Sequence, residues 1–544
     1  MKTKIQYTLA AFLLLPAALT AQTQNPDTTL NRTVVVEQEY APHLRDAAKV
    51  NVLPRVDEPQ VTPRQVEYDI ALSPAAQIPA DTMQAFAADE VPEQATPGYV
   101  RAGYGNYNNL DVYANYLFRL SSADRLGLTF SMDGMDGKLD WGDDAPKWNA
   151  FDYRTRAAVD YTHRFGRLDL NVAGHFGLRN FNLLPDSYAG KQKFTSGDVH
   201  VGVASTAADL PVQYRAETNL MLYQRQHGPG YDGAQEVLAR TKADVWGIIS
   251  EGQSVGLALQ MDNAVYSKND FDNYTALSLT PYYQYENGRW DIRAGVHVDP
   301  AFGFTNELCV SPDVRVQYAF PANAVLYLQA TGGRLLNDFR RLESVSPYAE
   351  PAGQLAATYE QVNAALGVKW GTAWGYWMHL FGGYQNLQDD VFYCGLPVGT
   401  SAYALGLGTW DTDNFYFGAE LSYDYRDIFR LSAQSIYRSW DTDVAGKEMG
   451  VLAFKPAVTF DFKLDIHPVR PLRVHVGYLK VTRAEVEDER LDAIDNLYAG
   501  ATYDLFPGIS VYARLDNLLN RHYQYDWFRP AEGLNFVGGV AFRF

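Results

Sequence analysis

The chain has 544 residues, of which 47% are hydrophobic and 14% aromatic, and its formal net charge is −18. Acidic residues outnumber basic residues by 64 to 46, so the chain lacks the excess of positive charge that neutralises phosphates, and nucleic acid is excluded as a partner. Beyond the N-terminal segment there is no run of about 18 apolar residues, which excludes a helical membrane protein.

The N-terminus has the pattern of an export signal. Lys2 and Lys4 precede a short apolar stretch, and small residues follow that stretch at Thr20 and Ala21. The sequence therefore predicts a signal peptide over residues 1–21.

Residues 22–97 differ in composition from the rest of the chain. They are rich in Pro, Ala, Gln, Asp and Glu, a composition that favours an extended arm over a packed domain. We expect this arm to lie in the periplasm or in the lumen of the domain that follows. That domain is predicted to span residues 98–544, where short segments of alternating polarity continue to the C-terminus.

The alternation has a period of two, which indicates β-strands. In one segment the apolar residues Ile292, Ala294, Val296 and Val298 alternate with Arg293, Gly295, His297 and Asp299. The same pattern places Asp461, Arg514 and Asp516 on the polar faces of two later segments. In a membrane barrel the polar face lines the lumen, so the candidate lumen-facing residues are Arg293, His297, Asp461, Arg514 and Asp516.

A soluble β-sandwich shows the same alternation, so strand number and strand length must distinguish the two folds. About 22 segments can be counted if residues 387–411 form one long external excursion. Many of them exceed the five or six residues typical of sandwich strands. Tight turns also alternate with longer links such as 334–356, as they do in outer-membrane barrels. The predicted fold is all-β, a transmembrane antiparallel β-barrel of about 22 strands with an extended N-terminal arm.

The C-terminus carries a pattern of its own. Gly539, Phe542 and Phe544 form a glycine followed by alternating terminal aromatic residues, which resembles the signal that outer-membrane proteins present to the barrel-assembly machinery. A last strand of this kind can pair through its exposed edge while its aromatic side chains face lipid. The alternative is an ordinary edge strand that ends in Phe.

The stretch from Tyr512 to Asn520, followed by Tyr523 and Gly533, resembles the closing hairpin of TonB-dependent receptors. That resemblance implies a 22-stranded barrel in the outer membrane, a globular N-terminal plug and energised uptake of scarce ligands. The arm 22–97 departs from the family because its 76 residues are too few, and too polar, to form the plug.

Thr33, Val34, Val35 and Val36 resemble the short hydrophobic box by which TonB grips such receptors from the periplasm. Pairing of an extended β-branched segment with the edge of a partner's sheet is a sound physical basis for that contact. Three consecutive valines are equally compatible with a small strand or with an arm packed in the lumen.

The sequence contains two cysteines, Cys309 and Cys394, both expected on the external side. An exported chain can form a disulfide between them, or they can remain two separate thiols. No zinc-binding helix motif, nucleophile elbow or phosphate loop is present, so the sequence predicts neither an enzyme nor a metal or cofactor site.

These features predict a protein of the Gram-negative outer membrane, most simply a TonB-dependent-receptor-like barrel that transports a solute or nutrient. The alternatives are an accessory or structural barrel whose arm binds a partner, and a passive porin. The expected partners are outer-membrane lipid, the barrel-assembly machinery, and TonB or another periplasmic or outer-membrane protein.

Overall fold

A computed structural model of the chain describes residues 96–140, 147–184, 187, 189–207, 210–228, 233–321, 323–372, 374–398, 402–426, 428–484, 492–526 and 529–544. The predicted signal peptide and the box Thr33–Val36 lie outside the described residues. So does the arm, except for its last two positions.

Most described residues lie in β-strands, whose alternating sequences favour a pleated sheet with one apolar face. The first twelve strands are β1 (Gly98–Gly105), β2 (Leu110–Arg119), β3 (Asp124–Leu139), β4 (Trp148–Arg164), β5 (Leu168–Phe181), β6 (Gln192–Ser205), β7 (Val212–Arg225), β8 (Ala234–Ser250), β9 (Gln253–Ser267), β10 (Tyr274–Glu286), β11 (Trp290–Gly303) and β12 (Glu307–Phe320). The remaining described strands are β13 (Ala324–Leu335), β14 (Glu350–Pro351), β15 (Thr358–Gly371), β16 (Tyr376–Val398), β17 (Ala402–Tyr425), β18 (Phe429–Asp441), β19 (Pro456–Val469), β20 (Leu472–Arg483), β21 (Ile494–Phe506), β22 (Ile509–Asp516) and β23 (Asn535–Arg543).

Among the described residues, three short helical segments interrupt the strands: η1 (Asn106–Asn108), α2 (Phe339–Val345) and α3 (Val444–Glu448). Within the described part of the chain, no helix is long and apolar enough to cross a membrane.

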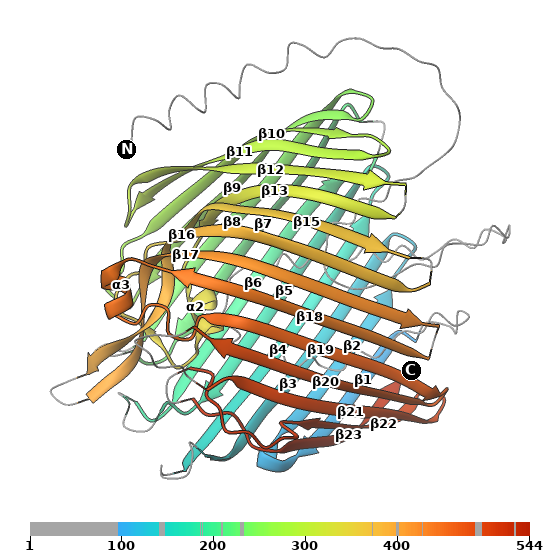
Figure 1. Ribbon diagram of the computed structural model, residues 1–544, viewed down its shortest axis with the longest axis vertical. Helices are drawn as coiled ribbons and strands as arrows, with labels where there is room; N and C mark the ends of the chain where they lie inside the picture. Colours follow the sequence, from blue (N-terminus) through green and yellow to red (C-terminus); the bar gives the residue numbers. More distant parts are fainter. Residues whose placement is uncertain are drawn as a thin grey trace. The chain divides into compact units, whose positions relative to one another are not determined.

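The strands form one closed antiparallel ring. Each strand pairs with its neighbours in chain order, except that β13 pairs with β15, because the two-residue β14 pairs with β17 in parallel outside the ring. The first and last strands close the ring, with Gly103 opposite Gly539 and Tyr99 opposite Arg543. Figure 1 shows the strands side by side from the blue β1 to the dark red β23. The predicted 22-stranded transmembrane barrel is confirmed.

The two faces of the wall differ in chemistry. On β7, Leu220 and Leu222 are each 46% exposed and point away from the polar residues of the same strand. On the opposite face, ion pairs join neighbouring strands, as between Arg293 Nε and Asp313 Oδ2 at 2.7 Å. The apolar face suits lipid and the polar face lines the lumen, as expected for an outer-membrane barrel.

The two ends of the barrel also differ. At one end the strands are joined by short turns, such as 251–252 and 507–508, and at the other end by longer links. Residues 387–411 belong to the longer end, where β16 and β17 stay paired from Tyr376 opposite Tyr423 to Val398 opposite Ala402. This segment is therefore one extended hairpin that adds no membrane strand, as the sequence predicted.

The C-terminal residues close the barrel instead of forming a free edge. β23 pairs with β22 on one side and with β1 on the other, and the backbone nitrogen of Gly98 donates to the carbonyl of Phe544 at 2.8 Å. Phe542 and Phe544 are 42% and 58% exposed, on the same face as the apolar side chains of neighbouring strands. A role as an assembly signal remains a prediction, because it concerns the unfolded chain before closure.

The assignment of faces can be tested with one substitution placed on each face of β11. Val296→Arg puts a charge in the lipid, which costs about 2–4 kcal/mol near the bilayer midplane. His297→Arg puts the same charge on the adjacent, lumen-facing position. We expect Val296→Arg to reduce the yield of folded barrel strongly and His297→Arg to leave it close to that of the wild type, measured by heat-modifiable gel mobility. Equal yields would contradict the assignment.

Candidate functional site

The link between β13 and β15, residues 336–357, lies at the long-link end of the barrel, and we call it the lid. The sequence predicted residues 334–356 as one of the longer external links, and the structure has a long link at this position. The link contains α2 and β14, and most of its side chains are buried. A link of this length without packing of its own is uncommon in a folded domain.

Helix α2 is stabilised by a side-chain cap at its first turn and by the burial of one apolar face. The side chain of Asp338 caps its first turn by accepting from the backbone nitrogen of Arg341 at 2.8 Å. Phe339, Leu342 and Val345 are spaced along one face and are all buried. Because a seven-residue helix is not stable alone, the burial of this face holds it in place.

The lid reaches lumenal side chains on β5, β6, β7 and β8, which are separated in the ring from its own strand β13 by β9 to β12. Arg340 pairs with Asp198, in the middle of β6, at 3.0 Å. Glu343 accepts from Tyr223 of β7 at 2.6 Å and pairs with Arg179 of β5 at 3.3 Å. The lid therefore leaves the wall at one side of the mouth and is anchored at another.

The most deeply buried anchor is the ion pair between Arg225 of β7 and Glu350 of β14. Their side chains are 2% and 1% exposed, and Arg225 Nη2 lies 3.0 Å from Glu350 Oε1. The same nitrogen donates to the carbonyl of Ala349 at 3.0 Å. The guanidinium also lies 4.7 Å from the ring centroid of Phe194. A buried pair of this kind is strongly destabilised when only one partner is removed.

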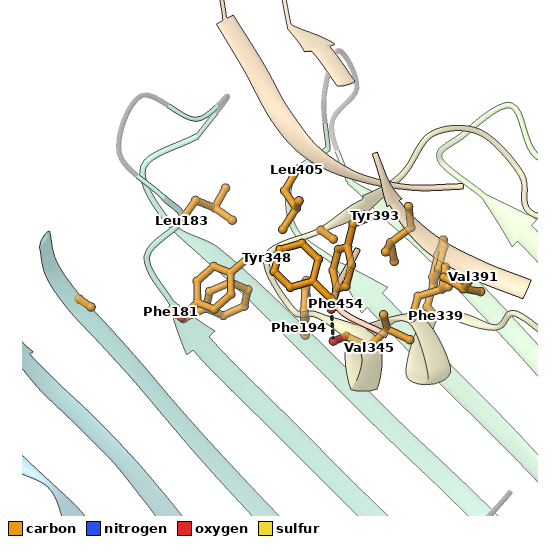
Figure 2. Close-up of a cluster of buried hydrophobic side chains, with 14 of the residues drawn as sticks. Phe181, Leu183, Phe194, Phe339, Val345, Tyr348, Val391, Tyr393, Leu405 and Phe454 are labelled. Atoms are coloured by element: carbon orange, nitrogen blue, oxygen red, sulfur yellow. Dashed lines mark hydrogen bonds between the residues drawn. The ribbon is translucent and has the colours of Figure 1, made fainter. Parts of the chain in front are cut away.

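An apolar cluster, whose side chains are drawn in Figure 2, lies beside these polar anchors and includes the Phe194 ring next to Arg225. Phe181 packs edge-on against both Phe194 and Tyr348, with 5.1 Å between ring centroids in each case. Side chains from the wall, the lid and the external hairpin thus share one core. Such a core at the mouth of a wide barrel excludes water from the contact between lid and wall.

The extended hairpin of β16 and β17 packs on the lid. Tyr393 donates to the carbonyl of Val345 at 2.9 Å, the bond drawn as a dashed line in Figure 2. Glu350 and Pro351 pair in parallel with Gly406 and Leu407 of β17. The hairpin therefore adds backbone hydrogen bonding to the lid.

Two further links join this assembly. Between β18 and β19, Lys455 forms a buried ion pair with Asp390 of the hairpin. Between β22 and β23, Tyr525 accepts through its carbonyl from Arg483 of β20 at 3.1 Å, and Arg483 also donates to the carbonyl of Phe454 at 3.1 Å. Several external links and the lid thus form one packed layer across this end of the barrel.

The candidate lumen-facing residues are paired with near neighbours. His297 lies 2.6 Å from the hydroxyl of Thr280, and Arg293 pairs with Asp313 as described above. Asp461 pairs with Lys463 at 3.1 Å, and Arg514 pairs with Asp516 at 3.0 Å. The structure does not bring these five residues together into one site, since they are spread over β11, β19 and β22.

Cys309 and Cys394 are free thiols. Cys309 lies on β12 and Cys394 on the extension of β16, and β13 and β15 stand between these strands in the ring. Of the two alternatives that the sequence allowed, the structure has the separate thiols. Within the described residues there is no group of three or more His, Cys, Asp or Glu placed to hold a metal ion.

The residues that anchor the lid were not identified from the sequence. The available signals were Asp338 as a helix cap and the spacing of Phe339, Leu342 and Val345 in a link that otherwise resembles a loop. Nothing local to Arg225 indicates that it pairs with a residue 125 positions away.

The barrel is similar in fold to solved outer-membrane transport proteins. It aligns with the FrpB iron transporter of Neisseria meningitidis at a TM-score of 0.65 and 10% identity, over 83% of this chain and 82% of that one. It aligns with the copper transporter OprC at a TM-score of 0.59 and 13% identity, over 83% of each chain.

A third similar structure is the ferric enterobactin receptor PfeA of Pseudomonas aeruginosa, with a TM-score of 0.64, 12% identity and coverage of 83% and 81%. The predicted resemblance to TonB-dependent receptors is confirmed at the level of the fold. No family model and no curated protein sequence matches the chain.

The Arg225–Glu350 anchor predicts the behaviour of the lid. Arg225→Met removes one partner of the buried ion pair, which costs about 3–5 kcal/mol, whereas Arg225→Met with Glu350→Leu removes both charges and restores most of the stability. We expect faster hydrogen exchange over residues 336–357 in the single variant and near wild-type exchange in the double variant. Unchanged exchange in the single variant would show that the pair does not hold the lid.

A buried carboxyl outside the lid has a raised pKa. Glu532, in the link between β22 and β23, accepts from Asn109 at 2.9 Å and from Asn535 at 2.5 Å. Burial, with a smaller contribution from the charge of Asp516, raises the pKa of Glu532 from 4.5 to about 7. Because the folded pKa is the higher one, this carboxyl's contribution to stability is full below about pH 4.5 and is lost as pH rises through about 7.

Glu532→Gln should therefore remove part of the pH dependence, since an amide keeps an acceptor oxygen but does not ionise. We expect the thermal midpoint of the wild type in detergent to fall more than that of Glu532→Gln between about pH 5 and about pH 8. The same fall in both proteins would exclude Glu532 as the titrating group.

Proposed function

We propose that the chain is a gated transport barrel of the TonB-dependent-receptor kind, located in the outer membrane of a Gram-negative bacterium. The observation that carries the proposal is the lid, a packed layer across one end of a barrel wide enough to pass a large solute. The anchors Arg225–Glu350 and Glu343–Tyr223 hold the closed state, and release of the lid admits the solute. The role is transport and not catalysis.

The similar folds support this proposal, because they include an iron transporter, a copper transporter and a ferric enterobactin receptor. In this proposal the arm 22–97 is the periplasmic part of the transporter, and Thr33 to Val36 form the segment that TonB or a comparable partner binds. Arg293, Asp461 and Arg514 then set the charge selectivity of the lumen wall.

A second candidate is an accessory barrel that moves no solute and uses its arm to hold a partner protein. The observation that favours it is that the arm has 76 residues, fewer than a plug domain needs. Co-purification of a partner that is lost when residues 22–97 are removed is the signature of this alternative.

Conductance in planar bilayers separates the two. In a chain that lacks residues 22–95, we expect few open events with the intact lid and frequent large steps with Arg225→Met. The variant that carries both Arg225→Met and Glu350→Leu should be closed again, because its lid is anchored without a stranded charge.

Two results would contradict the proposal. If the truncated chain conducts equally with and without Arg225→Met, the lid does not close the pore. If none of the three proteins conducts, the barrel is not a pore, and the accessory role becomes the better account.

A further inference from the structure

The lipid-facing wall carries a groove across β13, β15, β16, β17 and β18, which we call the outer groove. It has a volume of about 570 Å³ and is lined by 11 residues. Pockets for small ligands generally have volumes of about 300–1,000 Å³. Among the described residues, the groove is distinct from the lid and from the lumen.

The strand register explains why a hollow forms here. Leu328, Leu366, Gly382, Phe417 and Tyr437 are successive partners across the five strands. Four of them project large side chains, and Gly382 projects none. The row therefore has a gap between Leu366 and Phe417.

The next row extends this gap. Ala364 is the partner of Tyr384, which is in turn the partner of Phe415. Phe415 and Phe417 are 64% and 59% exposed, and Leu366 is 54% exposed. Small residues thus form the floor of the groove and exposed large residues form its walls.

The chemistry of the lining favours an apolar ligand. It contains no charged residue, and the hydroxyl of Tyr384 is already used, since it donates to Asp413 at 2.6 Å. The groove opens on the face that the barrel presents to the hydrocarbon, so lipid chains are its immediate surroundings.

We propose that the outer groove is a binding site for one acyl chain of a membrane lipid. Lipid tails are as apolar as the wall, so retention comes from shape and dispersion contacts and not from the hydrophobic effect. A chain seated between Leu366 and Phe417 contacts protein on several sides, whereas a chain on a smooth part of the wall contacts it on one. This inference does not depend on the transport proposal.

The test is native mass spectrometry of the full chain, reconstituted with phosphatidylethanolamine and then transferred to mild detergent. Ala364→Phe fills the groove, and its matched control is Ala216→Phe, a lipid-facing position on β7 outside the groove. Phe417→Ala removes a wall, and its matched control is Phe176→Ala, which removes a lipid-facing ring that is 46% exposed on β5.

We expect the wild type and both controls to retain one lipid per barrel. In both groove variants, the fraction of barrels that carry this lipid should fall at least several-fold. Heat-modifiable gel mobility reports whether each variant has folded. Because Ala364→Phe fills the groove and Phe417→Ala removes one of its walls, either variant alone tests the proposal if the other does not fold. Equal retention in groove and control variants overturns the proposal. A polypeptide retained in place of the lipid, with its loss in the groove variants, also overturns it.

Discussion

Every structural feature of this protein depends on the pairing of its backbone within the membrane. In hydrocarbon an unpaired peptide group costs several kcal/mol, so a sheet that crosses the bilayer must have no open edge. The pairing of β1 with β23, together with the contacts between Gly98 and Phe544, satisfies this requirement. The alternation of apolar and polar residues follows from the same closure, because each strand then faces lipid on one side and the lumen on the other.

A barrel of 22 strands encloses a wide lumen. The protein therefore also needs a structure that closes this lumen. At the end with long links the lid closes the lumen, and its polar anchors contact several strands of the wall. The combination of an apolar cluster with the buried pair Arg225–Glu350 makes the closed state specific in position. The same pair makes the closed state sensitive to mutation, because a substitution of Arg225 or Glu350 alone removes one partner of a buried ion pair.

The sequence predicted the wall well and the lid poorly, and the reason is physical. A strand such as β11 shows its face assignment within a few residues, because lipid and lumen impose opposite polarity on Val296 and His297. The hairpin at 387–411 could be assigned because the parity of the barrel requires it. The lid depends on contacts such as Glu343 with Tyr223, whose partners are far apart in sequence and carry no local pattern. The outer groove is likewise visible only when the register brings Gly382 between Leu366 and Phe417.

In the membrane, the lid stays anchored against the wall near β6 and β7. A pulsed electron paramagnetic resonance distance between spin labels at Ser344 of the lid and Lys193 of β6 tests it directly, in a background where Cys309 and Cys394 are replaced by Ser. In lipid nanodiscs we expect one short and narrow distance distribution. A broad distribution, or a long distance that places Ser344 back towards β13, would contradict it.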